Sequence, residues 1–226
     1  MTGWLQTVLF WTSPAFPVGA FSYSHALEWL VETGQVKDRA DLEAYIRALI
    51  TFGDLQADAA YLAAAHRCDP ESLPEILEDA AALRGAGELA SESTDQGRAF
   101  VKALAETGRT YPRLEILTAT APDRTGGLMP HSVAFGAAAH DAGIPIEAAI
   151  ESWLHAAVAN LVSAGQRLVP LGQRDGVAAI AGLKSDIADA TRCALKTRPE
   201  DIVSSGVAID MAALFHETQY TRLFRS

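Results

Sequence analysis

Apolar side chains recur every three or four residues along most of the chain, which is the spacing of one face of an α-helix. The pattern is clearest in segment 144–168 and is also regular in segment 39–67. The apolar positions are Leu42, Tyr45, Ile46, Leu49 and Ile50 in the earlier segment, and Ile150, Trp153, Leu154, Ala157, Val158, Leu161 and Val162 in the later one. Both segments are therefore predicted to be helical, and their many alanines allow neighbouring helices to approach closely.

Residues that start and stop helices mark further elements. Ser24 is a suitable N-cap for a helix that ends at Gly34, where a glycine permits the left-handed conformation of a helix end. Prolines near the start and a glycine at the end predict a helix over segment 70–85. Further helices are predicted over segments 92–108, 172–198 and 207–219.

Strand patterns are nearly absent. Segment 114–121 is a weak candidate, and segments 121–130 and 198–206 are interpreted as connections between helices. No repeat and no low-complexity linker divides the sequence. The pattern predicts one all-α domain over residues 1–226, a bundle of roughly eight to ten helices.

Composition narrows the function classes. The 226 residues are 49% hydrophobic and 20% charged, as in an ordinary globular protein, and their net charge of −10 argues against a nucleic-acid partner. Cys68 and Cys193 are isolated, which argues against a disulfide scaffold or a zinc cluster and fits a reducing cytosol. Segment 1–14 has no basic start, and its apolar run is too short to span a membrane. We expect a cytoplasmic protein with no membrane partner.

Catalytic motifs are weak or missing. The glycines of segment 85–90 lack the strand–turn–helix context of a dinucleotide site, and a turn at a helix end explains them better. The sequence contains no phosphate-binding G-x-x-x-x-G-K-[ST] loop and no G-x-S-x-G motif. Its histidines are scattered, and the i, i+2 pair His66 and Cys68 would point apart on a helix. We expect neither catalysis nor a tight metal site within one subunit.

Two segments stand out from this helical background. The opening segment, residues 13–29, reads SPAFPVGAFSYSHALEW and combines two stiff prolines with Phe16, Phe21 and Tyr23. The last residues, 216–226, read HETQYTRLFRS and mix aromatic side chains with arginines, which is the composition of interface hot spots. Each segment could instead pack on the protein's own core, and the residues alone leave both interpretations open.

Together these segments resemble the UreF family of urease accessory proteins. The resemblance rests on the opening segment, on AGQRLVPLGQRDG at residues 164–176 and on the terminal HETQYTRLFRS, in that order along the whole chain. Residues 66–145 match more loosely, through ASESTDQGRAF. The resemblance implies an all-α homodimer that is not an enzyme. It implies a complex with UreD (also called UreH) and the GTPase UreG that delivers nickel to apo-urease.

The resemblance also implies roles for particular residues. Nickel and GTP would act through the partners, so no intrinsic cofactor is expected. A mobile N-terminal segment, about residues 1–20, and a C-terminal tail, residues 217–226, would lie near each other and become ordered when UreD binds. The UreG-binding face and switch are expected at Phe21, Tyr23, Arg167 and Arg222. The UreD contacts are expected at His216, Gln219, Tyr220, Leu223, Phe224 and Arg225.

Two of these positions depart from the pattern of several relatives. Phe21 stands where some relatives carry Tyr, so packing rather than a hydroxyl hydrogen bond would operate there. Arg167 stands where several carry Lys. Its planar guanidinium suits a carboxylate or phosphate, as in an arginine finger toward the GTPase, but a cation at a helix end is an equally good explanation.

A second class of function is a helical enzyme or a small-molecule carrier with a pocket between the Ala-rich helices. An enzyme should show convergent titratable groups, whereas the inward positions of the predicted helices are Ala, Leu, Ile and Val. The residues therefore favour an adaptor.

Overall fold

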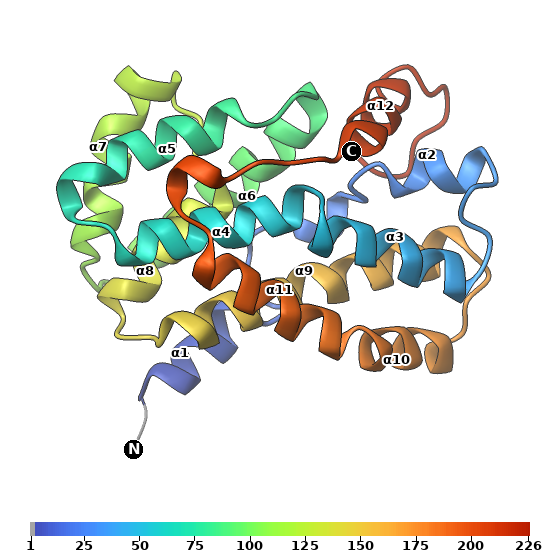
Figure 1. The fold of residues 1–226 in the computed structure, drawn as a ribbon, viewed down its shortest axis with the longest axis horizontal. Coiled ribbons are helices and arrows are strands. Elements are labelled where there is room, and N and C mark those ends of the chain that lie inside the picture. Colours follow the sequence, from blue (N-terminus) through green and yellow to red (C-terminus); the bar gives the residue numbers. More distant parts are fainter. Residues whose placement is uncertain (1–2) are drawn as a thin grey trace.

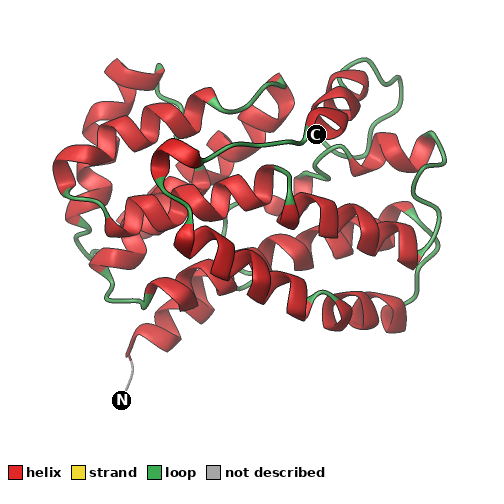
Figure 2. Ribbon diagram, viewed as in Figure 1, coloured by secondary structure: helices red, strands yellow, loops and turns green. Residues whose placement is uncertain are grey.

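The computed structural model describes residues 3–226, and this part of the chain folds into helices and loops without a strand (Figures 1 and 2). The α-helices are α1 (Gly3–Trp11), α2 (Leu27–Glu32), α3 (Arg39–Thr51), α4 (Asp54–Arg67), α5 (Leu73–Ala82), α6 (Gly87–Ala105), α7 (Pro112–Thr125), α8 (His131–Asp141), α9 (Ile146–Leu168), α10 (Gln173–Gly182), α11 (Lys184–Lys196) and α12 (Val207–His216). Short 3-10 turns are η1 (Ala20–Ser22), η2 (Pro70–Ser72) and η3 (Pro199–Asp201). The predicted all-α fold is confirmed.

The centre of the bundle is the close pair α4 and α8, which α9, α11 and the α5–α7 region surround (Figure 1). A Cβ added at Gly136 in α8 would lie 2.3 Å from the carbonyl oxygen of Leu62 in α4, so only glycine permits this approach. Every residue from Ser132 to Ala139 is buried. Sequence analysis missed α8 because a helix that is buried on all sides shows no polar face and hence no stripe.

Several predicted boundaries needed correction. The predicted helix over segment 39–67 is divided at Gly53 into α3 and α4, and the one over segment 172–198 is divided near Leu183 into α10 and α11. Segment 114–121 was wrong as a strand candidate because it lies within α7. Helix α7 also extends through Pro122 to Thr125, into a segment that was expected to be a loop.

The opening segment covers the core of this bundle. Phe16 is buried, and its ring lies 5.6 Å from that of Phe100, which in turn lies 5.4 Å from that of Trp11. This part of the segment therefore packs on the protein's own interior, one of the two interpretations that the residues left open. The expected mobility of residues 1–20 stays a prediction, and residues 1–2 lie outside the described part of the chain.

Helix α9 is a 23-residue element that carries the predicted site residue Arg167. Its buried face includes Trp153, Leu154 and Val158, which confirms the helical spacing read from the sequence. Its last turn holds Arg167 beside the opening segment. Among residues 3–226, no helix has both the length and the apolar content that a membrane crossing requires.

Candidate functional site

The tail folds back from the end of α12 and lies against the opening segment (Figure 1). The amide of Arg225 donates to the carbonyl of Ser22 at 2.9 Å, and the amide of Ser24 donates to the main-chain oxygen of Ser226 at 3.1 Å. The Phe224 ring is buried. The tail and residues 22–24 are thus joined by main-chain hydrogen bonds although they lie about two hundred residues apart in sequence.

Glu28 anchors the tail through both of its carboxylate oxygens. Oε1 accepts the amide of Leu223 at 2.7 Å, and Oε2 accepts the amide of Phe224 at 2.9 Å. Glu28 is itself buried in the first turn of α2. Hydrogen bonds to an ionised acceptor are roughly twice as strong as neutral ones, so this carboxylate fixes the path of the tail.

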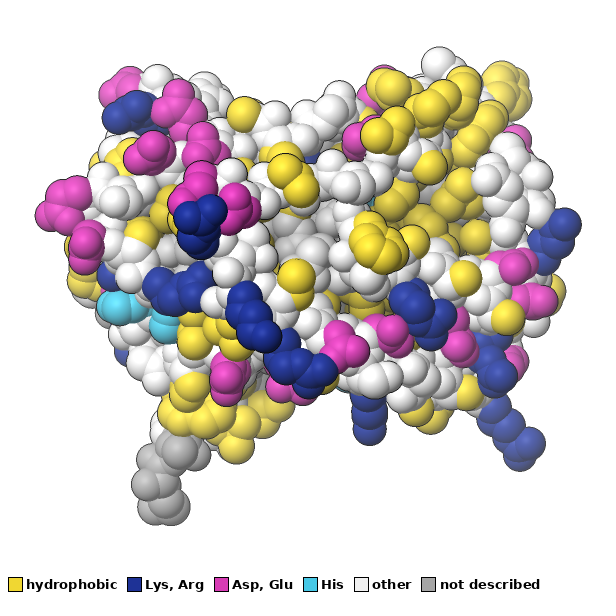
Figure 3. Space-filling view, viewed as in Figure 1, with side chains coloured by type: hydrophobic (Ala, Val, Ile, Leu, Met, Phe, Trp, Pro, Cys, Tyr) yellow, Lys and Arg dark blue, Asp and Glu magenta, His cyan; other side chains and the backbone are white. Residues whose placement is uncertain are grey.

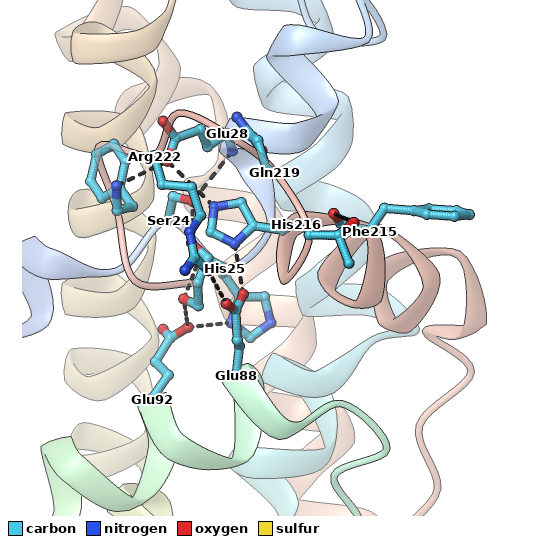
Figure 4. Close-up of polar contacts among 12 residues, drawn as sticks. Ser24, His25, Glu28, Glu88, Glu92, Phe215, His216, Gln219 and Arg222 are labelled. Atoms are coloured by element: carbon cyan, nitrogen blue, oxygen red, sulfur yellow. Dashed lines mark hydrogen bonds and ion pairs between the residues drawn. The ribbon is translucent and has the colours of Figure 1, made fainter.

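His216, at the end of α12, is enclosed by two carboxylates (Figure 4). Its Nδ1 lies 2.6 Å from Oε2 of Glu88 and its Nε2 lies 3.4 Å from Oε2 of Glu28. Nη1 of Arg222 in the tail lies 2.5 Å from the other oxygen of Glu88. One carboxylate on α6 therefore holds both the last helix and the tail.

A second polar cluster continues from Ser226 into the core. The Ser226 hydroxyl donates to Oε2 of Glu92 at 2.6 Å, and Nδ1 of His25 lies 3.3 Å from the same oxygen. Burial by itself lowers the pKa of His25, but the charges of Glu92 and Asp54 and the Glu92 hydrogen bond outweigh it and raise the pKa. Burial raises the pKa of Glu92, yet His25 and the Ser226 hydroxyl bring it below its usual value.

Arg84 forms ion pairs with the two acidic residues Asp54 and Asp58, at the end of this cluster that lies deepest in the core. Its Nη1 lies 2.5 Å from Oδ2 of Asp54, and its Nη2 contacts Asp58. Burial opposes ionisation of Asp54, but Arg84 and then His25 lower its pKa. Burial dominates at Asp58 and raises its pKa. The negative charges of these buried carboxylates are thus compensated by only a few buried cationic groups, mainly Arg84 and His25.

The backbone between these clusters is strained. His25 and Ala26 both have positive φ values, 55° and 65°, although neither is glycine. The Tyr45 hydroxyl donates to the carbonyl of His25, and the His25 amide lies 3.4 Å from the Ser226 hydroxyl oxygen. Strain of this kind persists where surrounding contacts over-determine the backbone, and here the tail supplies some of those contacts.

Arg167 joins the opening segment to the tail. Its Nη2 donates to the carbonyl of Phe21 at 3.0 Å, and its guanidinium lies over the Phe224 ring, 4.3 Å from the ring centre. It also occupies the last turn of α9, where a cation interacts favourably with the helix dipole. In this structure the Arg167 guanidinium therefore contacts two other segments of the same chain.

The predicted site residues separate into exposed and buried groups. Phe21 is 70% exposed and Leu223 is 63% exposed, and Tyr220 and Arg225 also face outward. Tyr23 is buried; its hydroxyl donates to Asp95 at 2.8 Å, and burial followed by this hydrogen bond raises its pKa.

Three further predicted contacts face the protein's own interior, whereas Arg167 and Arg222 are exposed although each contacts other residues of the chain. His216, Phe224 and Gln219 are buried, and Gln219 donates to Glu32 and to the carbonyl of Thr221. Arg222 pairs with Glu88. The structure thus brings the opening segment, Arg167 and the tail together, while the partner roles of all ten residues stay predictions.

Sequence reasoning missed the residues that hold this site together, namely Ser24 as a tail contact, His25, Glu28, Glu88 and Glu92. Glu28 lies inside the quoted opening segment, but its i, i+4 neighbour Glu32 gave it no visible role. Its real partners are 188 to 196 residues away. The sequence shows only an acidic residue in a predicted helix beside an aromatic motif, and this pattern does not reveal that the residue is buried.

A cavity of about 590 Å³ lies beneath the opening segment, between α6 and α9. Its walls are largely apolar and aromatic, and the charged groups in its lining include His25, Arg84 and Glu92, which take part in the ion pairs described above. Nδ1 of His131 accepts from Nε1 of Trp153 at 3.3 Å, and burial lowers the pKa of His131 to about 4. If the protein instead bound a small molecule, as in the alternative function, this cavity would be its binding pocket.

Potential metal ligands remain dispersed in three dimensions. Across the described part of the chain, no three His, Cys, Asp or Glu side chains are arranged to hold one ion. His66 and His140 lie side by side, but each forms a hydrogen bond with a main-chain carbonyl, at 2.9 and 2.8 Å. The expected lack of a tight nickel site stays a prediction for direct measurement.

Comparison with known proteins gives a consistent result. The sequence model of the family described as UreF matches residues 36–184. The chain is 41% identical to the "Urease accessory protein UreF" of Rhodopseudomonas palustris strain BisB18, over 98% of this chain and 92% of that protein. It is 43% identical to the protein of the same name from Granulibacter bethesdensis, over 98% of this chain and 94% of that protein.

Proposed function

Because the chain belongs to the UreF family of urease accessory proteins, we propose that it is the adaptor that joins UreD (UreH) to the GTPase UreG during nickel delivery to apo-urease. Its role is that of an accessory protein rather than an enzyme. Nickel and GTP act through the partners in this proposal, and the adaptor works in the cytoplasm as a homodimer.

The observation that carries the proposal is the division of the tail into anchors and exposed side chains. Phe224 and Ser226 are buried, and the Glu28 carboxylate accepts the amides of the consecutive residues Leu223 and Phe224. The same path leaves Tyr220 and Leu223 in solvent, close in sequence to their anchors. Exposed aromatic and apolar side chains on a fixed backbone are suited to binding a partner because little entropy is lost on association.

The contacts also support communication between two binding faces. UreD binds the exposed tail residues Tyr220, Leu223 and Arg225 in this proposal, and UreG binds the face that includes Phe21. Arg167 contacts both the carbonyl of Phe21 and the ring of Phe224. A partner that favours the docked tail therefore also favours one arrangement of the Phe21 turn, which is the coupling that an ordered adaptor requires.

Deletion of residues 219–226 tests the proposal. The truncated chain should remain helical and should no longer retain UreD when the two are co-expressed and separated by size-exclusion chromatography. Arg222→Ala removes one ion pair to Glu88 and should keep UreD while it weakens UreG recruitment. A truncated chain that still forms the complete complex with both partners would contradict the proposal.

A further inference from the structure

The cavity of about 590 Å³ beneath the opening segment has the size of a small-molecule site. Ligand pockets in proteins typically have volumes of about 300–1,000 Å³ and mainly apolar walls. The walls here include the aromatic side chains of Trp11, Phe16, Phe135 and Trp153, and residues 11–21 line one side without a break. A molecule bound in this cavity would be enclosed between the opening segment and the helices α6 and α9.

The charged side chains buried in the lining already have partners within the chain. Arg84 forms an ion pair with Asp58, and Glu92 faces Nδ1 of His25. His131 is neutral at physiological pH, because burial lowers its pKa to about 4. A charged ligand would therefore lose its water without gaining an unpaired counter-ion, which is costly in an apolar cavity. The lining favours a neutral molecule.

Two carboxamides in the lining give the cavity a preference for hydrogen-bond donors. Nε2 of Gln96 on α6 donates to Glu92, and Nδ2 of Asn160 on α9 donates to the carbonyl of Tyr23, both at 3.4 Å. Within residues 3–226 the oxygen of each carboxamide accepts no hydrogen bond, and neither oxygen is completely buried. Both oxygens are therefore available to a ligand that carries an N–H or O–H group.

We propose that this cavity is the binding site of a neutral, mainly aromatic small molecule that carries an N–H or O–H donor. The rings of the ligand pack between the aromatic walls, and its donor bonds to a carboxamide oxygen of Gln96 or Asn160. The site does not depend on the adaptor function, because this chain supplies every residue that lines it.

A second apolar hollow has to be distinguished from the cavity in a binding experiment. It has a volume of about 430 Å³ and lies between α12, α2 and the end of α3. Figure 3 shows apolar side chains gathered over this region at the upper right. No charged side chain lines this groove, and Phe52 and Phe215 in its lining are exposed. Apolar probes can adhere to such a surface, so the experiment includes a variant that fills it.

Three probes and three matched variants test the site. Indole is neutral and aromatic and has one N–H donor, indene has nearly the same shape without the donor, and indole-3-acetate is negatively charged. Ala157→Leu narrows the cavity from α9, whereas Ala148→Leu makes the same change at another half-buried position of α9, outside the lining. Ala208→Leu narrows the groove on α12. Binding to the full chain is measured by ligand-observed NMR titration, and thermal melting checks the fold of each variant.

We expect indole to bind about two- to tenfold more tightly than indene, which is the range for one net hydrogen bond, and indole-3-acetate to bind more weakly than either. The double variant Gln96→Met/Asn160→Leu should still bind indene but lose the preference for indole. Ala157→Leu should weaken both neutral probes, whereas Ala148→Leu and Ala208→Leu should bind like wild type. Indole should also slow hydrogen exchange of the amides in residues 12–21, which cover the cavity.

Several results would overturn the proposal. These are no binding of indole, equal affinity for indole and indene, or an unchanged preference for indole in the double variant. Loss of binding in Ala208→Leu but not in Ala157→Leu would assign the probes to the groove instead. If Ala157→Leu fails to fold, hydrogen exchange of the wild-type chain decides, because protection outside residues 12–21 alone would place indole elsewhere. No partner protein is present, so these results stand whether or not the chain acts as an adaptor.

Discussion

Replacement of Glu28 by alanine should release the tail without unfolding the protein. The change removes the acceptor of two main-chain amides, which lie 2.7 and 2.9 Å from its carboxylate oxygens, and one of the two carboxylates that face His216. A hydrogen bond to a charged group contributes about 1.5–3 kcal/mol, so about 3–6 kcal/mol of tail docking depends on this side chain.

Release of the tail should cost less free energy than unfolding of the bundle. The docked tail is also held by the buried Phe224 ring, about 1.5–3 kcal/mol, and by the cation–π contact with Arg167, about 0.5–2 kcal/mol. The hydrogen bonds of Arg225, Ser226 and Gln219 and the Arg222–Glu88 ion pair remain in the variant. The bundle core does not include the amides of Leu223 and Phe224, so it is not weakened directly. A loss of about 3 kcal/mol raises the undocked population by roughly 10²-fold.

Two measurements report the undocked population. Hydrogen exchange of the amides in residues 217–226 and trypsin cleavage after Arg222 should both accelerate by about that factor, provided that docking is fast relative to exchange or cleavage. Glu43→Ala, which removes only a surface pair with Arg39, is the matched control. Glu32→Ala, which removes one bond to Gln219, should lie between the two. Wild-type protection of the tail in Glu28→Ala would refute the anchoring role.

Three further predictions concern the bundle itself, and each is checked by equilibrium unfolding. Gly136→Ala should destabilise by about 1–3 kcal/mol or more, because the new Cβ meets the Leu62 carbonyl, whereas Gly3→Ala, with nothing within 4 Å, should not. Arg84→Met should cost about 3–5 kcal/mol because Asp54 and Asp58 lose their cation, while the exposed Arg192→Met should cost under about 1 kcal/mol. His131, with a folded pKa of about 4, binds a proton more readily when unfolded, so stability should fall by up to about 3 kcal/mol from pH 6.5 to pH 4. His131→Phe should remove this part of the pH dependence, and an unchanged slope would contradict the assignment.

The pH dependence above this range has a different origin. The pKa of His25 is raised by Glu92 and Asp54 despite its burial, so its contribution is complete below the unfolded value near 6.5 and is lost as the pH rises through the folded value. His131 acts only below pH 6.5. The two histidines therefore affect different pH windows and can be separated by single substitutions.

Most helices with one buried and one solvated face could be predicted, although the short helix α1, with only Val8 and Trp11 buried, was not. Helix α9 matches its predicted range closely because Trp153, Leu154 and Val158 repeat on one side. Helix α8 could not be predicted in this way because its small residues are buried all round. Helix α7 continues through Pro122, a residue that normally ends a helix, so its last turn was taken for a loop.

The candidate site could be predicted only in part, for a related reason. The unusual aromatic and basic side chains of the opening segment and the tail identified these two segments, whereas Arg167 was expected only from the resemblance to the UreF family. The pairing of Glu28 with Leu223 and of Glu88 with His216 depends on tertiary contacts across more than a hundred residues. No local pattern distinguishes a buried glutamate that binds main-chain amides from one on a solvated helix face.

Docking of the tail and binding of UreD should be coupled, because the exposed tail residues are the proposed UreD contacts. His216 at the end of α12 faces Glu28 and Glu88, and the anchored tail that follows holds Tyr220 and Leu223 in solvent. If UreD binds only the docked form, its apparent dissociation constant is the intrinsic value divided by the docked fraction. A Glu28→Ala chain with one tenth of its tails docked should then bind about tenfold more weakly, although the exposed side chains of its tail are unaltered. UreD should in turn protect the tail from trypsin, since coupling between two equilibria is reciprocal. Equal UreD affinity of Glu28→Ala and wild type, with the tail shown to be released, would mean that UreD does not require the docked tail.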